Sequence, residues 1–400
     1  MSRTVSGTIA LVATNGPRAV GGLSAYARHL GEELRATRPV LHVIRFPTDT
    51  RSSTAYGARL EVGEDATIVP GEALFDHRPA ARPLAHLVGR AMHRPPTRRL
   101  AQLGHTWSLE PSLERAIPSS VSHLHWIGTG WELSGFAVAG QARRRGIPFS
   151  VWPAVHPGAW GDSQFDMTFY AQADAVLAQS EHERSLLIEA GIDEAKVHRM
   201  TLAPAVSATG DGRRLRHRLG LRDERLVLFV GRRDGYKGYD LLLRAMMTIW
   251  EAHPDVRVLA CGPHGGQAAV KDPRVIDLGL VDESTKADAY AAADVFCLPS
   301  RFEAFGIAYV EAWSYGLPVV AGDCAAVAEL VRDGKDGLLV AHSPEAVIRA
   351  ILTLLEDDEA RARMGAAGRE RQKKEFTWNR VARMHQSVFA RVEAEVSARS

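Results

Sequence analysis

One strand-loop-helix-strand unit late in the chain constrains the fold more than any other stretch of the sequence. The apolar run Asp294–Leu298 predicts a buried strand that leads into a loop. A helix is expected from about Phe305 to Tyr315, because Gly316 and Pro318 stop it there. The next strand then begins at Val319. A unit of this kind is typical of an α/β fold with a parallel sheet.

Two glutamates of this unit are candidate ligand-binding residues. Glu303 lies in the loop just before the helix, and Glu311 lies in its second turn. A carboxylate among apolar neighbours needs a partner, and the hydroxyl groups of a sugar or ribose can serve. The amides of Phe305, Gly306 and Ile307 at the helix start can hold an anion. The alternative is a pair of surface glutamates beside an amphipathic helix.

Short apolar runs alternate with helical stretches along most of the chain, which indicates parallel sheets wrapped by helices. A length of 400 residues favours two such domains. The other expected strands are Ile9–Ala13, Val40–Phe46, Thr67–Pro70, Ser122–Ile127, Phe149–Trp152, Ala175–Ala178, Val197–Leu202, Leu226–Val230, Val256–Gly262, Val275–Gly279 and Gly337–Ala341.

Two glycine-rich loops each follow an expected strand and precede an expected helix. The first contains Gly21 and Gly22, and such a turn can receive a phosphate, although a plain turn is the alternative. It lacks the GxGxxG spacing, which disfavours a nicotinamide or flavin site. The second runs from Gly231 to Gly238 and carries Arg232 and Lys237. A planar guanidinium and a lysine charge in one loop form a good diphosphate clamp.

Two further stretches carry candidate residues. His156 lies in a loop after an expected strand, where sites form in α/β sheets, although a single loop histidine is more often not catalytic. Residues 77–105 contain six arginines and no acidic residue. We favour a solvated helical segment here, because Pro95, Pro96 and two earlier prolines break a long helix. The alternatives are a membrane-surface or an anionic-acceptor patch.

Together these motifs resemble the retaining GT-B glycosyltransferases of family 4, over nearly the whole chain and most weakly from 45 to 120. The signature reads Pro299-Ser300, then Glu303-x-Phe305-Gly306, then Glu311-Ala312, then Gly316-x-Pro318-Val319-Val320. The Gly231-Arg232 and Lys237-Gly238 pairs and the Gly-Gly loop before the first helix also fit. The chain departs from the family at Ala203-Pro204-Ala205-Val206, where many members have Asn-Gly-x-Asp.

The resemblance implies a role for each candidate. Glu303 would contact the donor sugar and Glu311 the ribose, while Arg232 and Lys237 would hold the leaving diphosphate. The implied catalytic set is Glu303, His156, Arg232 and Lys237. The implied donor-binding residues are Gly21, Gly22, Gly231, Arg232, Lys237, Gly262, Val281, Glu303, Ala304, Phe305, Gly306, Ile307 and Glu311.

The resemblance also implies an α/β GT-B fold with two Rossmann-like, doubly wound domains that face a cleft. We expect an acceptor-binding domain over residues 1–206, a nucleotide-sugar-binding domain over 207–378, and a helix over 379–400 that returns to the first domain. The implied reaction is the retaining transfer of a sugar from a nucleoside-diphosphate sugar to an acceptor hydroxyl of a small polar metabolite, natural-product precursor or saccharide. A UDP-sugar is the favoured donor and a GDP-sugar is the next candidate. A catalytically silent GT-B subunit is the alternative.

Composition excludes other classes. A net charge of +2 argues against a nucleic-acid partner, and no apolar run approaches the length of a membrane span. The short polar start before Ile9 predicts no secretory signal, and three scattered cysteines fit a cytoplasmic protein. No Asp-x-Asp occurs, so we expect no metal and no cofactor besides the donor. Peripheral membrane contact through residues 77–105 is the less favoured alternative.

Overall fold

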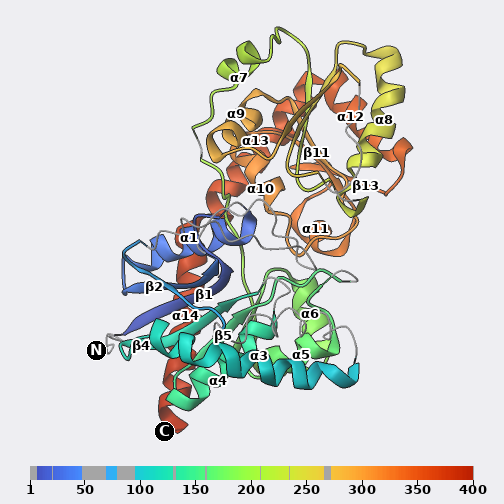
Figure 1. Cartoon of the computed structure of the whole chain (residues 1–400). Helices are drawn as coiled ribbons and strands as arrows, with labels where there is room; N and C mark the ends of the chain where they lie inside the picture. The colour runs from blue at the N-terminus through green and yellow to red at the C-terminus, as the bar shows by residue number, and fades with distance from the viewer. Residues whose placement is uncertain are drawn as a thin grey trace. The chain divides into compact units, whose positions relative to one another are not determined.

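The computed structural model describes residues 7–19, 21–46, 69–78, 95–128, 132–157, 160–207, 209–233, 235–264 and 272–399. The chain forms two compact units, which we call the first and second unit (Figure 1). The first unit contains residues 1–179, 183–200 and 381–400, and the second contains residues 180–182 and 201–380. The sequence predicts the corresponding limits at 206 and 378.

The first unit has a seven-stranded sheet in the order β3-β2-β1-β4-β5-β6-β7, with parallel pairing throughout the described strands. The strands are β1 (Thr8–Asn15), β2 (Val40–Phe46), β3 (Glu72–Leu74), β4 (Val121–Ile127), β5 (Phe149–Trp152), β6 (Ala175–Ala178) and β7 (Val197–Arg199). Its helices are α1 (Gly22–Leu34), α3 (Pro95–Ala116), α4 (Glu132–Arg145), α5 (Gln164–Tyr170), α6 (Glu181–Glu189) and α14 (Trp378–Arg399).

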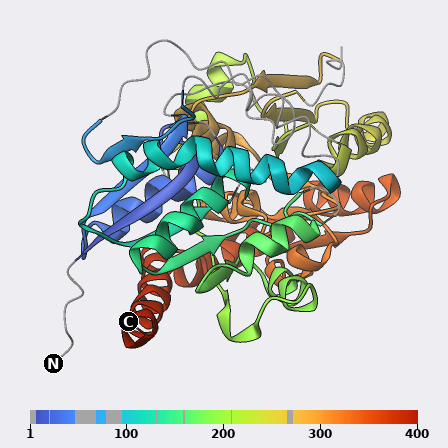
Figure 2. The same cartoon turned by 60° about the horizontal axis from the view of Figure 1, so that its bottom comes forward.

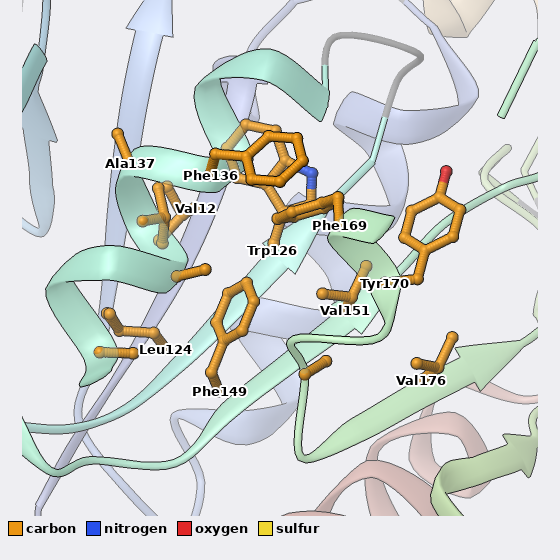
Figure 3. Packing of buried hydrophobic residues seen from close by; sticks show 14 of the residues in the cluster. Val12, Leu124, Trp126, Phe136, Ala137, Phe149, Val151, Phe169, Tyr170 and Val176 are labelled. Carbon is orange, nitrogen blue, oxygen red and sulfur yellow. The ribbon is translucent and has the colours of Figure 1, made fainter. Parts of the chain in front are cut away.

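One face of this sheet carries an apolar core beneath α3, α4 and α5. Because side chains alternate along a strand, Val12 and Trp126 point to the same face and join Phe136 and Phe169 in one cluster (Figure 3). The Phe136 and Phe169 rings lie 5.1 Å apart, and Trp126 meets Phe169 edge-on at 6.2 Å. This packing fixes α4 and α5 over the strands whose loops carry the candidate residues of the first unit.

The opposite face is covered by α1 and α14 and is partly polar. Figure 2 shows α3 and α14 on opposite sides of the sheet. The Tyr26 hydroxyl on α1 lies 2.6 Å from Nε2 of His385 on α14 and 3.5 Å from Nε2 of His125 on β4. Glu393 on α14 accepts a hydrogen bond from Arg38 at 2.7 Å. The C-terminal helix is therefore joined to the first unit by buried polar contacts.

The second unit has a six-stranded sheet in the order β10-β9-β8-β11-β12-β13, again with parallel pairing in the described strands. The strands are β8 (Leu226–Val230), β9 (Arg257–Cys261), β10 (Val275–Gly279), β11 (Val295–Leu298), β12 (Val319–Gly322) and β13 (Gly337–Val340). The helices are α7 (Gly212–Arg218), α8 (Tyr239–Ala252), α9 (Glu283–Ala292), α10 (Ile307–Ser314), α11 (Ala325–Leu330), α12 (Pro344–Glu356) and α13 (Asp358–Glu375).

The three cysteines are free thiols. Cys261 and Cys297 are buried in β9 and β11, and Cys324 is half-buried. Burial raises the pKa of the Cys261 thiol to about 12 and that of Cys324 to about 11. Burial also raises the pKa of Cys297.

Three local predictions need correction. Val69 and Pro70 of the predicted strand 67–70 are not in a strand; Glu72–Leu74 forms β3 instead, because a turn in which the Glu72 amide donates to the Val69 carbonyl precedes it. Helix α10 begins at Ile307 rather than Phe305. Pro95 begins α3 instead of breaking a helix, and this long helix even contains Pro111.

The arginine-rich stretch 77–105 is described only at its two ends, since residues 79–94 lie outside the described residues. Arg78 and Arg98 lie over the rings of Trp107 and Phe165, at 4.5 and 5.5 Å. Leu100 and Leu103 on α3 are exposed. The membrane-surface and acceptor alternatives for this stretch stay predictions.

Candidate functional site

The candidate site of the second unit lies at the carboxyl ends of its parallel strands. The loop after β8 carries Arg232 and Lys237, the loop after β9 begins with Gly262, and the loop after β11 carries Glu303. Because the strands are parallel, these loops meet at one edge of the sheet, where ligands bind in open α/β folds. Val281 follows β10 at the same edge.

Glu303 and Lys237 form an ion pair at this edge. Lys237 Nζ donates to Glu303 Oε1 at 2.7 Å, and Ser300 Oγ donates to the same oxygen at 2.8 Å. The side chains of Lys237 and Glu303 are only 15% and 6% exposed, respectively. Burial lowers the pKa of Lys237, but Glu303 and Tyr236 together raise it more, so the lysine pKa lies above its usual value. The arrangement therefore places a lysine charge directly beside the predicted sugar-binding carboxylate.

Glu311 is also buried, and its two oxygens accept from different donors. Lys286 Nζ donates to Oε1 at 2.9 Å, and the Tyr290 hydroxyl donates to Oε2 at 2.8 Å. Both donors lie on α9, one helical turn apart. Burial and the charge of Glu311 raise the pKa of Tyr290, so the phenol keeps the proton that it donates. The alternative of a solvated surface glutamate is therefore wrong for Glu311.

Sequence reasoning missed the residues that support the two glutamates. Ser300 enters the sequence signature without a role of its own, and the sequence motifs include neither Lys286 nor Tyr290. The available signal was the i, i+4 spacing of Lys286 and Tyr290 on a helix, which places both on one face. Nothing in the sequence specifies that this face meets Glu311.

The start of α10 is shaped by Gly306, which has φ 92° and ψ 51°. This left-handed conformation favours glycine, and a Cβ at this position would lie 2.6 Å from the Tyr309 ring. Within the described chain, the amides of Phe305, Gly306 and Ile307 donate to no backbone carbonyl. The Phe305 side chain packs against Phe376, and Ala304 is buried. The backbone amides are thus the polar groups that this turn offers to a ligand.

The glycine-rich loop after β8 has both structural and candidate binding residues. Gly262 approaches Gly231 so closely that a Cβ would lie 2.0 Å from the Gly231 carbonyl oxygen. Arg233 is buried, forms an ion pair with Asp277 and lies over the Tyr239 ring at 5.3 Å. Arg233 therefore anchors the loop. Its neighbour Arg232 is half-buried, and its role as a diphosphate ligand stays a prediction.

Three predicted residues belong to the first unit. Gly21 and Gly22 are exposed at the start of α1, and a Cβ at either would meet no described atom within 4 Å. His156 lies in the loop after β5, with Nδ1 3.1 Å from the Ala154 carbonyl oxygen. Its ring stacks on Trp160 at a centroid distance of 4.0 Å. The other predicted site residues all belong to the second unit.

No group of three or more His, Cys, Asp or Glu residues among the described ranges could hold a metal ion. Independence of metal and cofactor stays a prediction. In the part of the chain that the structure describes, no helix has both the length and the apolar character needed to cross a membrane.

The two Rossmann-like α/β units place the protein in the GT-B class of folds. Sucrose-phosphate synthase from Thermosynechococcus elongatus aligns with a TM-score of 0.74 and 21% identity, covering 97% of this chain and 100% of that chain. The Anabaena protein HepE, solved in complex with UDP and glucose, aligns with a TM-score of 0.69 and 18% identity, covering 95% and 99%. These likenesses confirm the predicted fold.

Residues 213–371, which lie within the second unit, match the family described as glycosyl transferases group 1. The D-inositol 3-phosphate glycosyltransferase of Xylanimonas cellulosilytica is 34% identical over 57% of this chain and 60% of its own length. The phosphatidyl-myo-inositol mannosyltransferase of Mycobacterium tuberculosis is 37% identical over 43% of this chain and 48% of its own length. The chain thus matches less than two thirds of either relative.

Proposed function

We propose that this protein is a retaining glycosyltransferase that moves a sugar from a nucleoside-diphosphate sugar to an acceptor hydroxyl. The observation that carries the proposal is the placement of Lys237, Glu303 and Glu311 within the region that matches the group 1 glycosyltransferase family, with Lys237 2.7 Å from Glu303. A UDP-sugar is the favoured donor, with a GDP-sugar next. A structural neighbour solved with UDP-glucose supports this order.

In this proposal the second unit holds the donor. Glu311 accepts hydrogen bonds from the ribose, and Glu303 accepts them from the sugar. Lys237, Arg232 and the amides at the start of α10 stabilise the negative charge that grows on the departing diphosphate. The nucleotide contacts the backbone at Gly231, Gly262 and Val281. No cofactor other than the donor is required.

The first unit binds the acceptor, a small polar metabolite, a natural-product precursor or a saccharide. The bond between the anomeric carbon and the diphosphate oxygen breaks, and a bond to the acceptor oxygen forms on the same face of the sugar. The acceptor proton passes to the departing diphosphate, so no side-chain nucleophile is needed. Gly21 and Gly22 meet the diphosphate at the start of α1, and His156 acts beside the donor sugar.

Binding of nucleotides to the intact protein tests the donor site. We expect UDP or GDP to raise the melting temperature of the wild type, because a ligand of the folded state stabilises it by mass action. Lys237→Ala and Glu311→Ala should each weaken that nucleotide by about tenfold or more, the effect of losing a hydrogen bond to a charged group. Lys373→Ala, which removes an exposed lysine of α13, should bind like the wild type.

Turnover of the donor tests the reaction. Incubation with UDP-sugars and GDP-sugars and an acceptor panel should release the nucleotide diphosphate and give a product with the donor's anomeric configuration, read by NMR. Glu303→Gln should lower this rate while nucleotide binding persists. A folded wild type that binds a nucleotide but consumes no donor would favour the catalytically silent subunit, and one that binds no nucleotide would refute the donor site.

A further inference from the structure

A second polar site lies in the first unit, at the carboxyl ends of β1 and β2. Val12 and Val43 point into the apolar core beneath α3 and α4. The alternation of a strand places Thr14 and Arg45, two residues further on, on the same face. The register of β1 and β2 pairs Ala13 with Ile44 and Asn15 with Phe46, so Thr14 and Arg45 are neighbours. The core therefore ends in polar residues at the edge where open α/β sheets bind ligands.

Side chains from three other segments converge on Arg45. Its NH1 donates to Ser134 Oγ at the start of α4 at 3.2 Å, and His105 Nε2 on α3 lies 3.1 Å from the same oxygen. The His105 ring meets the ring of His77 edge-on at 4.4 Å, and His77 follows β3. We call Thr14, Arg45, His77, His105 and Ser134 the Arg45 cluster.

Two members of the cluster, Thr14 and His105, are buried and each keep a polar atom without a hydrogen-bond partner in the described part of the chain. Thr14 is 2% exposed and His105 is 5% exposed. Within the described residues, Thr14 Oγ1 and His105 Nδ1 have no hydrogen-bond partner. Burial lowers the pKa of the Arg45 guanidinium to about 10, against the raising effect of Asp76. Buried polar atoms of this kind are costly unless something bonds to them, which points to a ligand.

Two carboxylates lie on this face, and the first of them forms a long ion pair with Arg45. Asp76 Oδ1 is 4.0 Å from Arg45 Nε, and its side chain is 36% exposed. The oxygens of Glu132 accept from Trp126 Nε1 at 2.6 Å and from the Tyr170 hydroxyl at 3.1 Å.

Arg38 is a second arginine of the first unit and provides a matched control for Arg45. It lies on the opposite face of the sheet and donates to the Glu393 carboxylate at 2.7 Å, to Ser122 Oγ at 2.9 Å and to the Gly7 carbonyl at 3.0 Å.

We propose that the Arg45 cluster binds an anionic oxygen group, a phosphate or a carboxylate, on the acceptor substrate. A guanidinium presents planar donors that match either group, and the Thr14 hydroxyl and His105 Nδ1 can add donors. This assignment rests on the proposed function, because only a transferase has an acceptor to recognise. It narrows the acceptor from any hydroxyl compound to one that carries a negative charge.

Anion binding to the intact protein tests the proposal. Sodium phosphate and sodium acetate are titrated separately by calorimetry at pH 7.5, with sodium chloride holding the ionic strength constant. We expect one of them to bind, which names the anion as phosphate or carboxylate. Arg45→Gln should weaken binding at least tenfold, as expected for a charge-assisted hydrogen bond. Thr14→Val, which keeps the side-chain volume, should weaken it by a smaller factor of about three or more.

Two controls locate the effect. Arg38→Gln should bind the anion like the wild type, because it removes an arginine of the other face. Lys237→Ala removes a proposed phosphate ligand of the second unit, so anion binding that persists in this variant and depends on Arg45 belongs to the cluster. Should Arg45→Gln fail to fold, as judged by circular dichroism, Thr14→Val decides the outcome.

The proposal is overturned when neither anion binds the wild type, when the folded Arg45 and Thr14 variants bind as tightly as the wild type, or when Lys237→Ala alone abolishes binding. Titrations of the same samples with UDP and with GDP keep the two proposals apart. Binding of either nucleotide without anion binding refutes the cluster and leaves the donor site standing. Anion binding that depends on Arg45, without binding of UDP or GDP, upholds the anion site and refutes the donor site.

Discussion

At the scale of single residues, Glu311 shows how a buried carboxylate is held in place. One oxygen accepts from the charged Lys286 amine and the other from the neutral Tyr290 hydroxyl. The Tyr290 ring is in turn stacked on Tyr315 with centroids 5.7 Å apart. Removing Lys286 would leave a carboxylate that is 3% exposed with only the neutral donor. Lys286 is therefore a positioning residue for Glu311.

We predict that Lys286→Met lowers the free energy of unfolding by about 1–3 kcal/mol, because a buried charge loses its partner. Combined with Glu311→Gln, its effect should be smaller than the sum of the single changes, with a coupling of about 0.5–3 kcal/mol. Urea denaturation of the four proteins in the cycle measures this. Lys373→Met serves as the exposed control, and strictly additive changes would show that the ion pair contributes nothing.

At the scale of an element, the contacts of α14 with the first unit include histidines that are buried in their neutral form. Burial lowers the pKa of His385 to about 4, although its bond to the Val381 carbonyl acts in the opposite direction. Burial likewise lowers the pKa of His123, against the effect of Glu393, and that of His125. In the unfolded chain a histidine has a pKa near 6.5 and binds a proton more readily.

The sign of the pH dependence follows from these shifts. Between about pH 6.5 and pH 4 the unfolded state binds more protons, so stability falls as the pH is lowered. At pH 5, His385 alone should cost on the order of 2 kcal/mol relative to pH 7.5. Urea denaturation at the two pH values measures the loss, which His385→Phe should reduce. His217→Gln, an exposed histidine of α7, should behave like the wild type, and equal losses in all three proteins would contradict the prediction.

The elements also show how much of the fold can be predicted from the sequence. The apolar runs 149–152 and 175–178 match the buried strands β5 and β6, because a buried parallel strand needs a continuous apolar run. Strand β10 matches the predicted range 275–279, although none of its residues is buried. Strand β3 was not predicted because it has only three residues and none of them is buried. The resemblance pointed to Glu303 and Glu311, whereas Lys286 and the Arg45 cluster depend on which helix faces meet, and that is a tertiary property.

At the scale of the whole molecule, the two units should respond to different ligands. Hydrogen exchange on the intact chain with UDP should protect amides of residues 231–238, 281–290 and 303–311, where the donor contacts are proposed. The α14 amides from residue 381 onward belong to the first unit and should change little. Protection confined to the first unit would show that the nucleotide binds there rather than in the second unit, which would contradict the proposed donor site.

The three thiols have a practical consequence. Because burial raises the pKa of every cysteine in the chain, their thiolates are scarce at neutral pH, and alkylating reagents should react with them slowly. A single cysteine introduced on an exposed helix of each unit would then accept a maleimide dye or a spin label selectively. The wild-type sequence is thus ready for distance measurements by fluorescence transfer or electron resonance without first replacing its own cysteines.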